Sequence, residues 1–305
     1  MASRKSFWGV YMSGETASLL VAIVWTFTAL MFERAAKIFG SLALNPLRLL
    51  MAFCFLSVFS FFVYGNPFPV GVEASSWMWL SLSGFVGFFI GDYFLFKAFE
   101  IIGSRISMLI MSLAPVISAF IGYLVLDEIL SITDILAVLI IIIGISLAVL
   151  TKKNGERIKI HHPLGGIIFA VIGACSQGAG LILAKIGMNN INAVNVTQCR
   201  VIAGFISFTL VLIFSGRLKK SVLSYRNQSG LLYASMGSFL GPFAGVSLSM
   251  YAISKTEVGV ASAIMSIVPV LLIPVSFVFE KKKVRIAEIL GIILAVSGVI
   301  ILFLM

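Results

Sequence analysis

Four charged side chains stand in or beside long apolar stretches, where a charge is costly enough to suggest a function. They are Glu15, Arg48, Asp92 and Arg200. If these stretches cross a bilayer, each charge near the centre costs about 2.5–3.5 kcal/mol or more, so such residues usually belong to a substrate or ion pathway. Arg48 and Asp92 should lie at similar depth and pair, and Arg200 could pair with Glu15. We interpret the four as coupling or gating charges; the alternative for either arginine is that it reaches out to lipid headgroups.

Asp92 is the strongest of these candidates because its short side chain cannot reach far toward headgroups. A carboxylate in a closed, dehydrated site favours its neutral form, whereas a hydrated site favours the ionised form. Asp92 could therefore couple the movement of protons, or of a charged substrate, to the opening and closing of a site. Its counterpart in the internal repeat described below is an apolar residue, Val246.

Two nearly identical hexapeptides, IMSLAP (110–115) and IMSIVP (264–269), each place a proline inside an apolar run. Proline removes a backbone donor and frees a carbonyl, which in a membrane must face protein or water. Serine hydroxyls nearby could serve that carbonyl, and methionine is a flexible side chain that suits varied ligands. We interpret the hexapeptides as matching kinks that line one cavity; the alternative is a pair of ordinary proline bends packed with methionine.

Polar and aromatic side chains near the middle of the apolar stretches complete the predicted substrate cavity. From the hexapeptides it would take Met111, Ser112, Pro115, Met265, Ser266 and Pro269, and from elsewhere Trp25, Thr28, Tyr93, Gln177, Gln198, Ser247 and Tyr251. Gln177 corresponds to Trp25 in the repeat, so the predicted site is chemically asymmetric. Glycines at four-residue spacing, at 87 and 91 and at 237, 241 and 245, would let helices approach closely, as static packing or as sliding surfaces.

The elements that must position these residues are apolar helices. Of the 305 residues 60% are hydrophobic and 11% are charged, whereas soluble domains have about 25% charged residues. A helix needs about 20 mostly apolar residues to cross a bilayer. Ten segments qualify, centred near Trp25, Phe55, Val86, Val116, Ile141, Cys175, Phe208, Leu240, Val268 and Leu294. The predicted fold is an all-α membrane protein with ten transmembrane helices, the first retained rather than cleaved as a signal peptide.

The two halves of the chain repeat one another. At an offset of about 154 residues the hexapeptides coincide, and a Gly-x-x-x-Gly pattern and an intramembrane arginine recur nearly in register. Each half holds five segments, an odd number, so the second half must enter the membrane in the opposite sense. We therefore predict two inverted five-helix repeats, 14–150 and 164–305, joined by a polar linker at 151–163. Many secondary transporters build alternating access from inverted repeats.

Lysine and arginine are concentrated in the connections that follow the odd-numbered segments. The positive-inside rule then places these connections in the cytoplasm and both termini outside. Arg4 and Lys5 pull in the other direction. The expected location is the plasma membrane, the inner membrane of a bacterial cell, with a multi-pass topology.

Ten segments in two homologous halves around a polar linker resemble the drug/metabolite transporter superfamily, in its EamA-type branch. The resemblance is carried by Trp25, by LRLLMAF (47–53), and by GFFIGDYFLFKAFEIIGSRISMLIMSLAPVISAFIGYLVLDE (87–128) with its repeat GPFAGVSLSMYAISKTEVGVASAIMSIVPVLLIPVSFVFE (241–280). One departure is that lysines stand opposite Asp127 and Glu128 in the second half, with Glu280 as the displaced acid. The resemblance implies a secondary transporter, an exporter of small organic metabolites such as amino acids, with a cavity between the halves.

Other functions fit the sequence less well. A membrane enzyme would need intramembrane His, Glu or Asp ligands, or a nucleophile with its base, and no such cluster is present. No phosphate-binding Gly-x-x-x-x-Gly-Lys-Ser/Thr pattern occurs, which argues against direct use of ATP. We expect no catalytic residue, cofactor or metal, because His161 and His162 form only a solvated pair. The remaining alternative is a non-transporting membrane scaffold or a lipid-handling protein, which would need no polar cavity.

The predicted partners follow from charge and hydropathy. The net charge is +10, but the basic residues lie in short connections, so anionic lipid headgroups are the expected neighbours rather than nucleic acid. Protons are the candidate coupling ion. The fifth and tenth segments are apolar enough to face lipid or a second copy, so the sequence allows a monomer or a homodimer. Cys54, Cys175 and Cys199 lie in apolar stretches, and we expect no disulfide.

Overall fold

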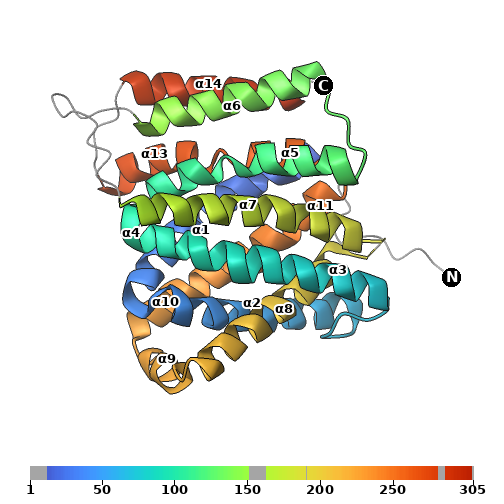
Figure 1. Ribbon diagram of the computed structural model, residues 1–305, viewed down its shortest axis with the longest axis vertical. Coiled ribbons are helices and arrows are strands. Elements are labelled where there is room, and N and C mark those ends of the chain that lie inside the picture. The colour runs from blue at the N-terminus through green and yellow to red at the C-terminus, as the bar shows by residue number, and fades with distance from the viewer. Residues whose placement is uncertain (1–11, 151–162, 190, 281–285, 304–305) are drawn as a thin grey trace.

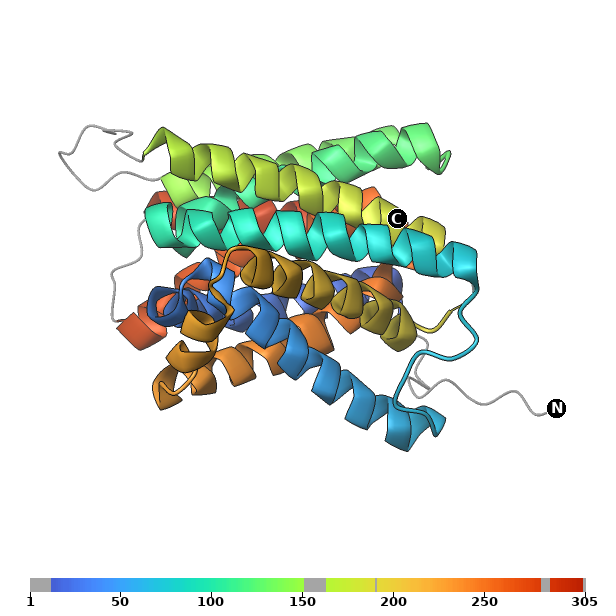
Figure 2. The same cartoon turned by 60° about the horizontal axis from the view of Figure 1, so that its bottom comes forward.

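The structure, a computed structural model, describes residues 12–150, 163–189, 191–280 and 286–303. In these residues it is built of helices that run mostly along one direction, as both views show (Figure 1, Figure 2). The predicted linker 151–163, apart from Pro163, lies outside the described residues, as do His161 and His162. Arg4 and Lys5 also lie outside them.

The first half contains five membrane-length segments made of seven helical elements. They are α1 (Gly14–Phe39), α2 (Ser41–Tyr64), the continuous run of α3 (Ala74–Gly84), the π-helix η1 (Phe85–Gly91) and α4 (Asp92–Met111), then α5 (Ala114–Val125) and α6 (Ile132–Leu150). Gly103 divides α4 with φ 76° and ψ 165°. Since only glycine adopts this backbone readily, Gly103 is the point where the third segment ends and the fourth begins.

The second half repeats this order, with one short helix added. It consists of α7 (Leu164–Gly187), α8 (Ala193–Phe214), the short α9 (Leu218–Ser224), the run of α10 (Gln228–Ser238), η2 (Phe239–Gly245) and α11 (Val246–Ile253), then α12 (Val258–Met265), α13 (Val268–Glu280) and α14 (Ile286–Phe303). Asparagine side chains begin two of these helices: Asn192 accepts from the Asn195 amide, and Asn227 accepts from the Gly230 amide, each at 2.8 Å.

Seven helical segments of the described residues are long and apolar enough to cross a membrane, and Ile132–Leu147 and Ile289–Leu302 are shorter apolar helices. With the run from α3 to Gly103, they account for the ten predicted segments. The halves run in opposite senses: α1 begins at one end of the bundle, whereas α7 begins at the other (Figure 1). We call the end where α1 ends at Phe39 and α7 begins at Leu164 the linker end, and the opposite end the N-terminal end.

The repeat is visible in the backbone conformation as well as in the amino-acid sequence. The two π-helices, 85–91 and 239–245, are each seven residues long and lie 154 residues apart, the offset at which the hexapeptides coincide. A π-turn widens a helix locally and is common at functional sites. Both π-helices border the cavity described below, which places this irregular backbone at the interface of the two halves.

The hexapeptides form helix breaks rather than kinked helices. One helix ends at Met111 and the next begins at Ala114, and the second hexapeptide breaks in the same way after Met265. The proline is therefore the second residue of a new helix, where its missing N–H is not needed. The serine hydroxyls donate to the carbonyls of Leu109 (2.5 Å) and Ala263 (2.7 Å), which also accept from the serine amides, and not to the carbonyls of Met111 and Met265 four residues before each proline.

The fifth and tenth segments, α6 and α14, pack on each other at one edge of the bundle, at the top of Figure 1. A Cβ added to Gly144 would lie 2.4 Å from the Ala295 nitrogen, and one added to Gly298 would lie 2.7 Å from the Ile141 side chain. Glycine is therefore required at this crossing. Each helix covers one face of its symmetry partner, while side chains such as Ile143 and Ile293 remain exposed.

Candidate functional site

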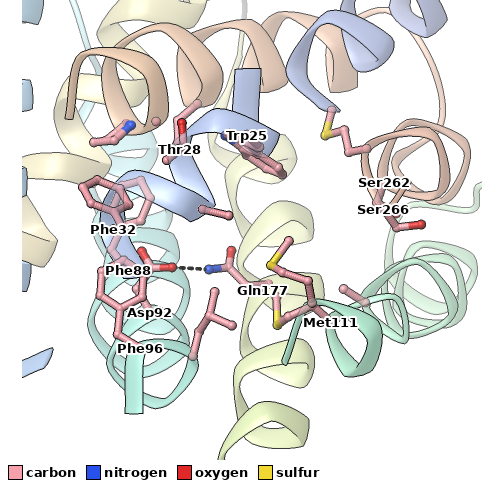
Figure 3. A pocket seen from close by; sticks show the side chains of 18 of the residues that line it. Trp25, Thr28, Phe32, Phe88, Asp92, Phe96, Met111, Gln177, Ser262 and Ser266 are labelled. Atoms are coloured by element: carbon pink, nitrogen blue, oxygen red, sulfur yellow. Dashed lines mark hydrogen bonds between the residues drawn. The ribbon is translucent and has the colours of Figure 1, made fainter. Parts of the chain in front are cut away.

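A cavity of about 150 Å³ lies at the centre of the bundle. Its walls come from both halves: α1, α2, η1, α4 and α5 from the first, and α7, η2, α11 and α12 from the second. The lining is mostly apolar, with a few polar groups that point inward from different helices (Figure 3). Apolar walls with a small number of convergent polar groups are typical of small-molecule sites.

Asp92 is the centre of a buried polar network on one wall. Its Oδ2 accepts a hydrogen bond from Nη2 of Arg48, and its Oδ1 accepts one from Nε2 of Gln177 at 2.7 Å (Figure 3). Arg48 also donates from Nε to the Asn45 side chain at 2.8 Å. The predicted pair of Arg48 and Asp92 is thus formed, and Gln177 extends it from the first half to the second.

Aromatic rings surround the guanidinium of Arg48. Its central carbon lies 5.5, 5.8 and 5.0 Å from the ring centres of Phe32, Phe88 and Phe96. These rings exclude water from the ion pair and offer π-faces to the cation. In low dielectric, the charges therefore interact more strongly than they would in water.

Arg200 occupies a different place from the one that the sequence suggested. It is 2% exposed, its Nη1 lies 3.0 Å from the Met250 sulfur, and its central carbon lies 4.9 Å from the Phe88 ring centre. Among the described residues Arg200 forms no ion pair with Glu15, and its guanidinium contacts the Met250 sulfur and the Phe88 ring instead. The predicted Glu15–Arg200 pair is wrong because Arg200 turns into the core rather than toward the N-terminal end.

Ten of the residues predicted from the sequence line the cavity: Trp25, Thr28, Arg48, Asp92, Met111, Ser112, Pro115, Gln177, Met265 and Ser266. Both hexapeptides therefore contribute to one cavity wall. Their contact with a substrate stays a prediction.

Seven other predicted residues do not line the cavity: Glu15, Tyr93, Gln198, Arg200, Ser247, Tyr251 and Pro269. Gln198 donates to the Pro67 carbonyl at 2.8 Å, and the Tyr251 hydroxyl donates to the Met12 carbonyl at 3.0 Å. Pro269 is buried beside its helix break, and the Ser247 hydroxyl is buried. The direction of these side chains around their helices was not predicted, since it depends on the neighbouring helices.

The sequence reasoning missed several residues that do line the cavity. They are apolar or small, and include Phe32, Phe88, Phe96, Phe99, Met108 and Ser262. A helical spacing signal was available: Phe88, Phe96 and Phe99 recur at intervals of eight and three residues around Asp92. Phenylalanine occurs 26 times in the chain, so this spacing alone did not single them out.

The N-terminal end of the bundle is closed by contacts between the halves. The Lys185 ammonium lies 2.5 Å from Glu128 Oε1 and donates to the Thr256 carbonyl at 3.0 Å, while the Val258 amide donates to Glu128 Oε2 at 3.0 Å. Deeper in, the hydroxyls of Ser118 and Ser262 lie 2.7 Å apart. These contacts join α5 and the residues after it to α7 and α12.

The linker end has different contacts. Glu33 accepts from the Ser104 hydroxyl and from Lys37, and Glu100 accepts from the Ser41 amide at 2.5 Å. These bonds stay within the first half. The cavity extends toward this end, since Phe99 and Met108 belong to its lining.

Contacts at the linker end also join the two halves, and one is a hydrogen bond from Arg34 Nη1 to the Tyr233 hydroxyl at 3.5 Å. The Tyr225 hydroxyl, between α9 and α10, donates to the Ala43 carbonyl at 2.7 Å. Burial raises the pKa of Tyr225 to about 12, so this donor stays protonated at neutral pH. The bond holds α2 to the second half on the side away from α6 and α14.

No group of three or more His, Cys, Asp or Glu side chains that could hold a metal occurs in the ranges that the structure describes. Cys54, Cys175 and Cys199 are free thiols.

Comparison with known proteins gives a family and a fold. A model of the EamA-like transporter family matches residues 12–150 and 164–304, which confirms the resemblance seen in the sequence. No curated protein matches significantly. A solved structure, titled only "Crystal structure of protein", is similar with a TM-score of 0.71 over 95% of this chain and 96% of that one, at 15% sequence identity. This likeness concerns the fold alone.

Proposed function

We propose that this chain, which belongs to the EamA-like transporter family, exports small organic metabolites such as amino acids by alternating access around its central cavity. Membership of this family means a multi-pass membrane transporter and not an enzyme. The observation that carries the proposal is the cavity between the halves, with the Asp92 network on one wall and aromatic and methionine side chains on the others.

Alternating access is supported by the unequal ends of the bundle. At the N-terminal end, Glu128, Lys185 and Val258 connect the halves, whereas the cavity reaches toward the linker end through Phe99 and Met108. Because the repeats are inverted, exchanging their conformations would open the N-terminal end and close the linker end. The present structure then corresponds to a state that takes up substrate from the linker end, which the distribution of lysine and arginine puts in the cytoplasm.

Asp92 is the proposed coupling group. It lies in the cavity wall, and its two oxygens are held by Arg48 from the first half and Gln177 from the second. A movement of one half against the other would therefore change its partners. Loss of one partner in a dry site favours protonation, and rehydration favours release of the proton, which links a proton to each conformational cycle.

Reconstitution into liposomes tests the function. Purified protein in vesicles preloaded with a single amino acid should exchange it for the same amino acid, labelled, on the outside. A proton gradient with the acidic side inside the vesicles should change the rate of exchange. Asp92→Asn should keep exchange but lose the response to the gradient. Asp127→Asn, on an exposed residue at the N-terminal end, is the matched control and should behave as the wild type.

The outcomes separate the alternatives. No exchange for any compound in a broad metabolite panel would favour a scaffold or lipid-handling protein. A proton response that survives in the Asp92→Asn protein would remove Asp92 from the coupling role while leaving the carrier in place. If intact cells that produce the protein take up the substrate rather than export it, the proposed direction of transport is wrong.

A further inference from the structure

The charges buried inside the bundle do not balance. Among the described residues, the charged residues classed as buried are Arg48, Asp92 and Arg200, which are 3%, 7% and 2% exposed. Arginine does not lose its proton in proteins. These three residues therefore hold two positive charges and, at most, one negative charge, and Glu128, whose side chain is 10% exposed, already pairs with Lys185. A buried charge that lacks a partner is strongly destabilising. An anionic ligand bound in the cavity would therefore stabilise the protein.

Arg200 is the cation whose partners are weak. The Met250 sulfur is a poor acceptor, the Phe88 ring offers only its π-face, and Nε has no hydrogen-bond partner among the described residues. The Arg200 backbone packs closely on α3, since a Cβ on Gly84 would lie 2.2 Å from the Arg200 carbonyl oxygen. Arg200 is 2% exposed, so its charge lies in the core.

Phe88 connects this cation to the cavity. The ring centre lies 5.8 Å from the Arg48 guanidinium and 4.9 Å from that of Arg200, and Phe88 itself lines the cavity beside Arg48 and Asp92. Arg200 does not reach the cavity surface. A ligand group against the Phe88 wall would nevertheless lie in the field of both arginines, with little water to screen it.

Resting on the proposed function, we infer that the transported substrate presents a carboxylate on an apolar body to this wall, and that Arg200 is a positioning residue that attracts the carboxylate through its field. The carboxylate lies against the wall formed by Phe88, near Arg48, where it competes with Asp92 for the cation. The apolar body packs on the remaining wall, formed by Phe99, Met108 and other apolar side chains.

The repeat offers a variant that tests this without removing an arginine. Val246 corresponds to Asp92, lines the cavity, and lies one helical turn before Met250, which contacts Arg200. Val246→Asp would place a second carboxylate on the face of α11 that Arg200 meets. The numbers of buried positive and negative charges would then be equal without a ligand. Val246→Asn is the control, because asparagine has the shape of aspartate without its charge.

Three probes of one shape measure the preference: 4-methylpentanoate, 4-methylpentanamide and 4-methylpentylammonium. Their binding to the purified full-length protein is followed by ligand-induced shifts of the thermal midpoint over a concentration series. The carboxylate should bind at least about tenfold more tightly than the amide, a difference typical of one charge-assisted contact, and the ammonium should bind least. Val246→Asp should abolish this preference, whereas Val246→Asn should keep it, as should Arg200→Lys.

Several results would overturn the inference. They are equal affinity for the carboxylate and the amide, the same preference in the two Val246 variants, or no binding of any probe at millimolar concentration. A carrier that exchanges neutral or cationic compounds in liposomes but no carboxylate would refute the anion preference and leave the proposed function standing. Absence of exchange for every compound would instead refute the function itself.

Discussion

Removing the negative member of the buried network should cost more stability than removing a positive one. Asp92→Asn keeps the shape of the side chain but leaves two buried arginines, Arg48 and Arg200, with no carboxylate between them. Arg48→Met leaves one buried carboxylate and one buried guanidinium, so the two charges are equal in number, and Asp92 keeps its hydrogen bond from Gln177. The charge balance therefore predicts that Asp92→Asn is the less stable variant. Side-chain size alone predicts the reverse, because Arg48→Met changes the larger side chain.

The magnitudes follow from the contacts. Breaking a buried pair so that charge is left uncompensated costs about 3–5 kcal/mol, which is the expected loss for Asp92→Asn. Arg48→Met loses hydrogen bonds to Asp92 and Asn45, and the expected loss is about 1–3 kcal/mol. Methionine fills the space between Phe32, Phe88 and Phe96 and limits the cavity left behind.

Reversible unfolding in mixed micelles, titrated with a denaturing detergent and followed by circular dichroism, measures both variants against the wild type. The free energy of unfolding should fall in the order wild type, Arg48→Met, Asp92→Asn. An Arg48→Met protein that is as unstable as Asp92→Asn, or less stable, would refute the reasoning, because the interior would then not be short of negative charge.

Three further predictions concern packing and the closed end. Gly84→Ala should lower the free energy of unfolding by about 1–3 kcal/mol, because its Cβ would lie 2.2 Å from a backbone oxygen; Gly165→Ala, with no atom within 4 Å, is the control and should be neutral or slightly stabilising in the same titration. Gly103→Ala should cost about 1–3 kcal/mol because φ is 76° there, and an unchanged stability would contradict the assigned backbone. Glu128→Gln weakens the contact that joins the halves, so a cysteine placed at Ser262 should react several times faster with an impermeant thiol reagent added at the N-terminal side; an unchanged rate would show that Glu128 does not hold that end closed.

The repeat could be read from the sequence because its evidence is local. Offset 154 aligned the hexapeptides, and the structure places a helix break at each of them and a π-helix at each of 85–91 and 239–245. Hydropathy gave the ten segments for the same reason, since a helix must be apolar over its whole length to cross a bilayer. The pairing of Arg48 with Asp92 could be predicted from the sequence because it required only that two residues on neighbouring segments lie at equal depth.

Contacts that depend on the rotation of each helix about its own axis could not be predicted from the sequence. The sequence suggested that Glu15 and Arg200 could pair, yet Arg200 faces Phe88 and Met250. Gln177 was predicted as a cavity residue but not as a partner of Asp92, and the contact of Glu128 with Lys185 was not foreseen. Depth follows from counting residues, whereas the rotation of a helix about its axis is set by close packing, such as that of Gly84 on the Arg200 backbone.

By itself, the amino-acid sequence determined that this is a membrane protein of two inverted halves, because apolar length, proline position and an odd segment count follow from the order of residues. Only the tertiary structure decided that Arg200 lies buried against Met250 and Phe88 and that the N-terminal end is closed. Those features arise where segments from different halves meet, and the energy of such a contact depends on distances between side chains that no single segment contains.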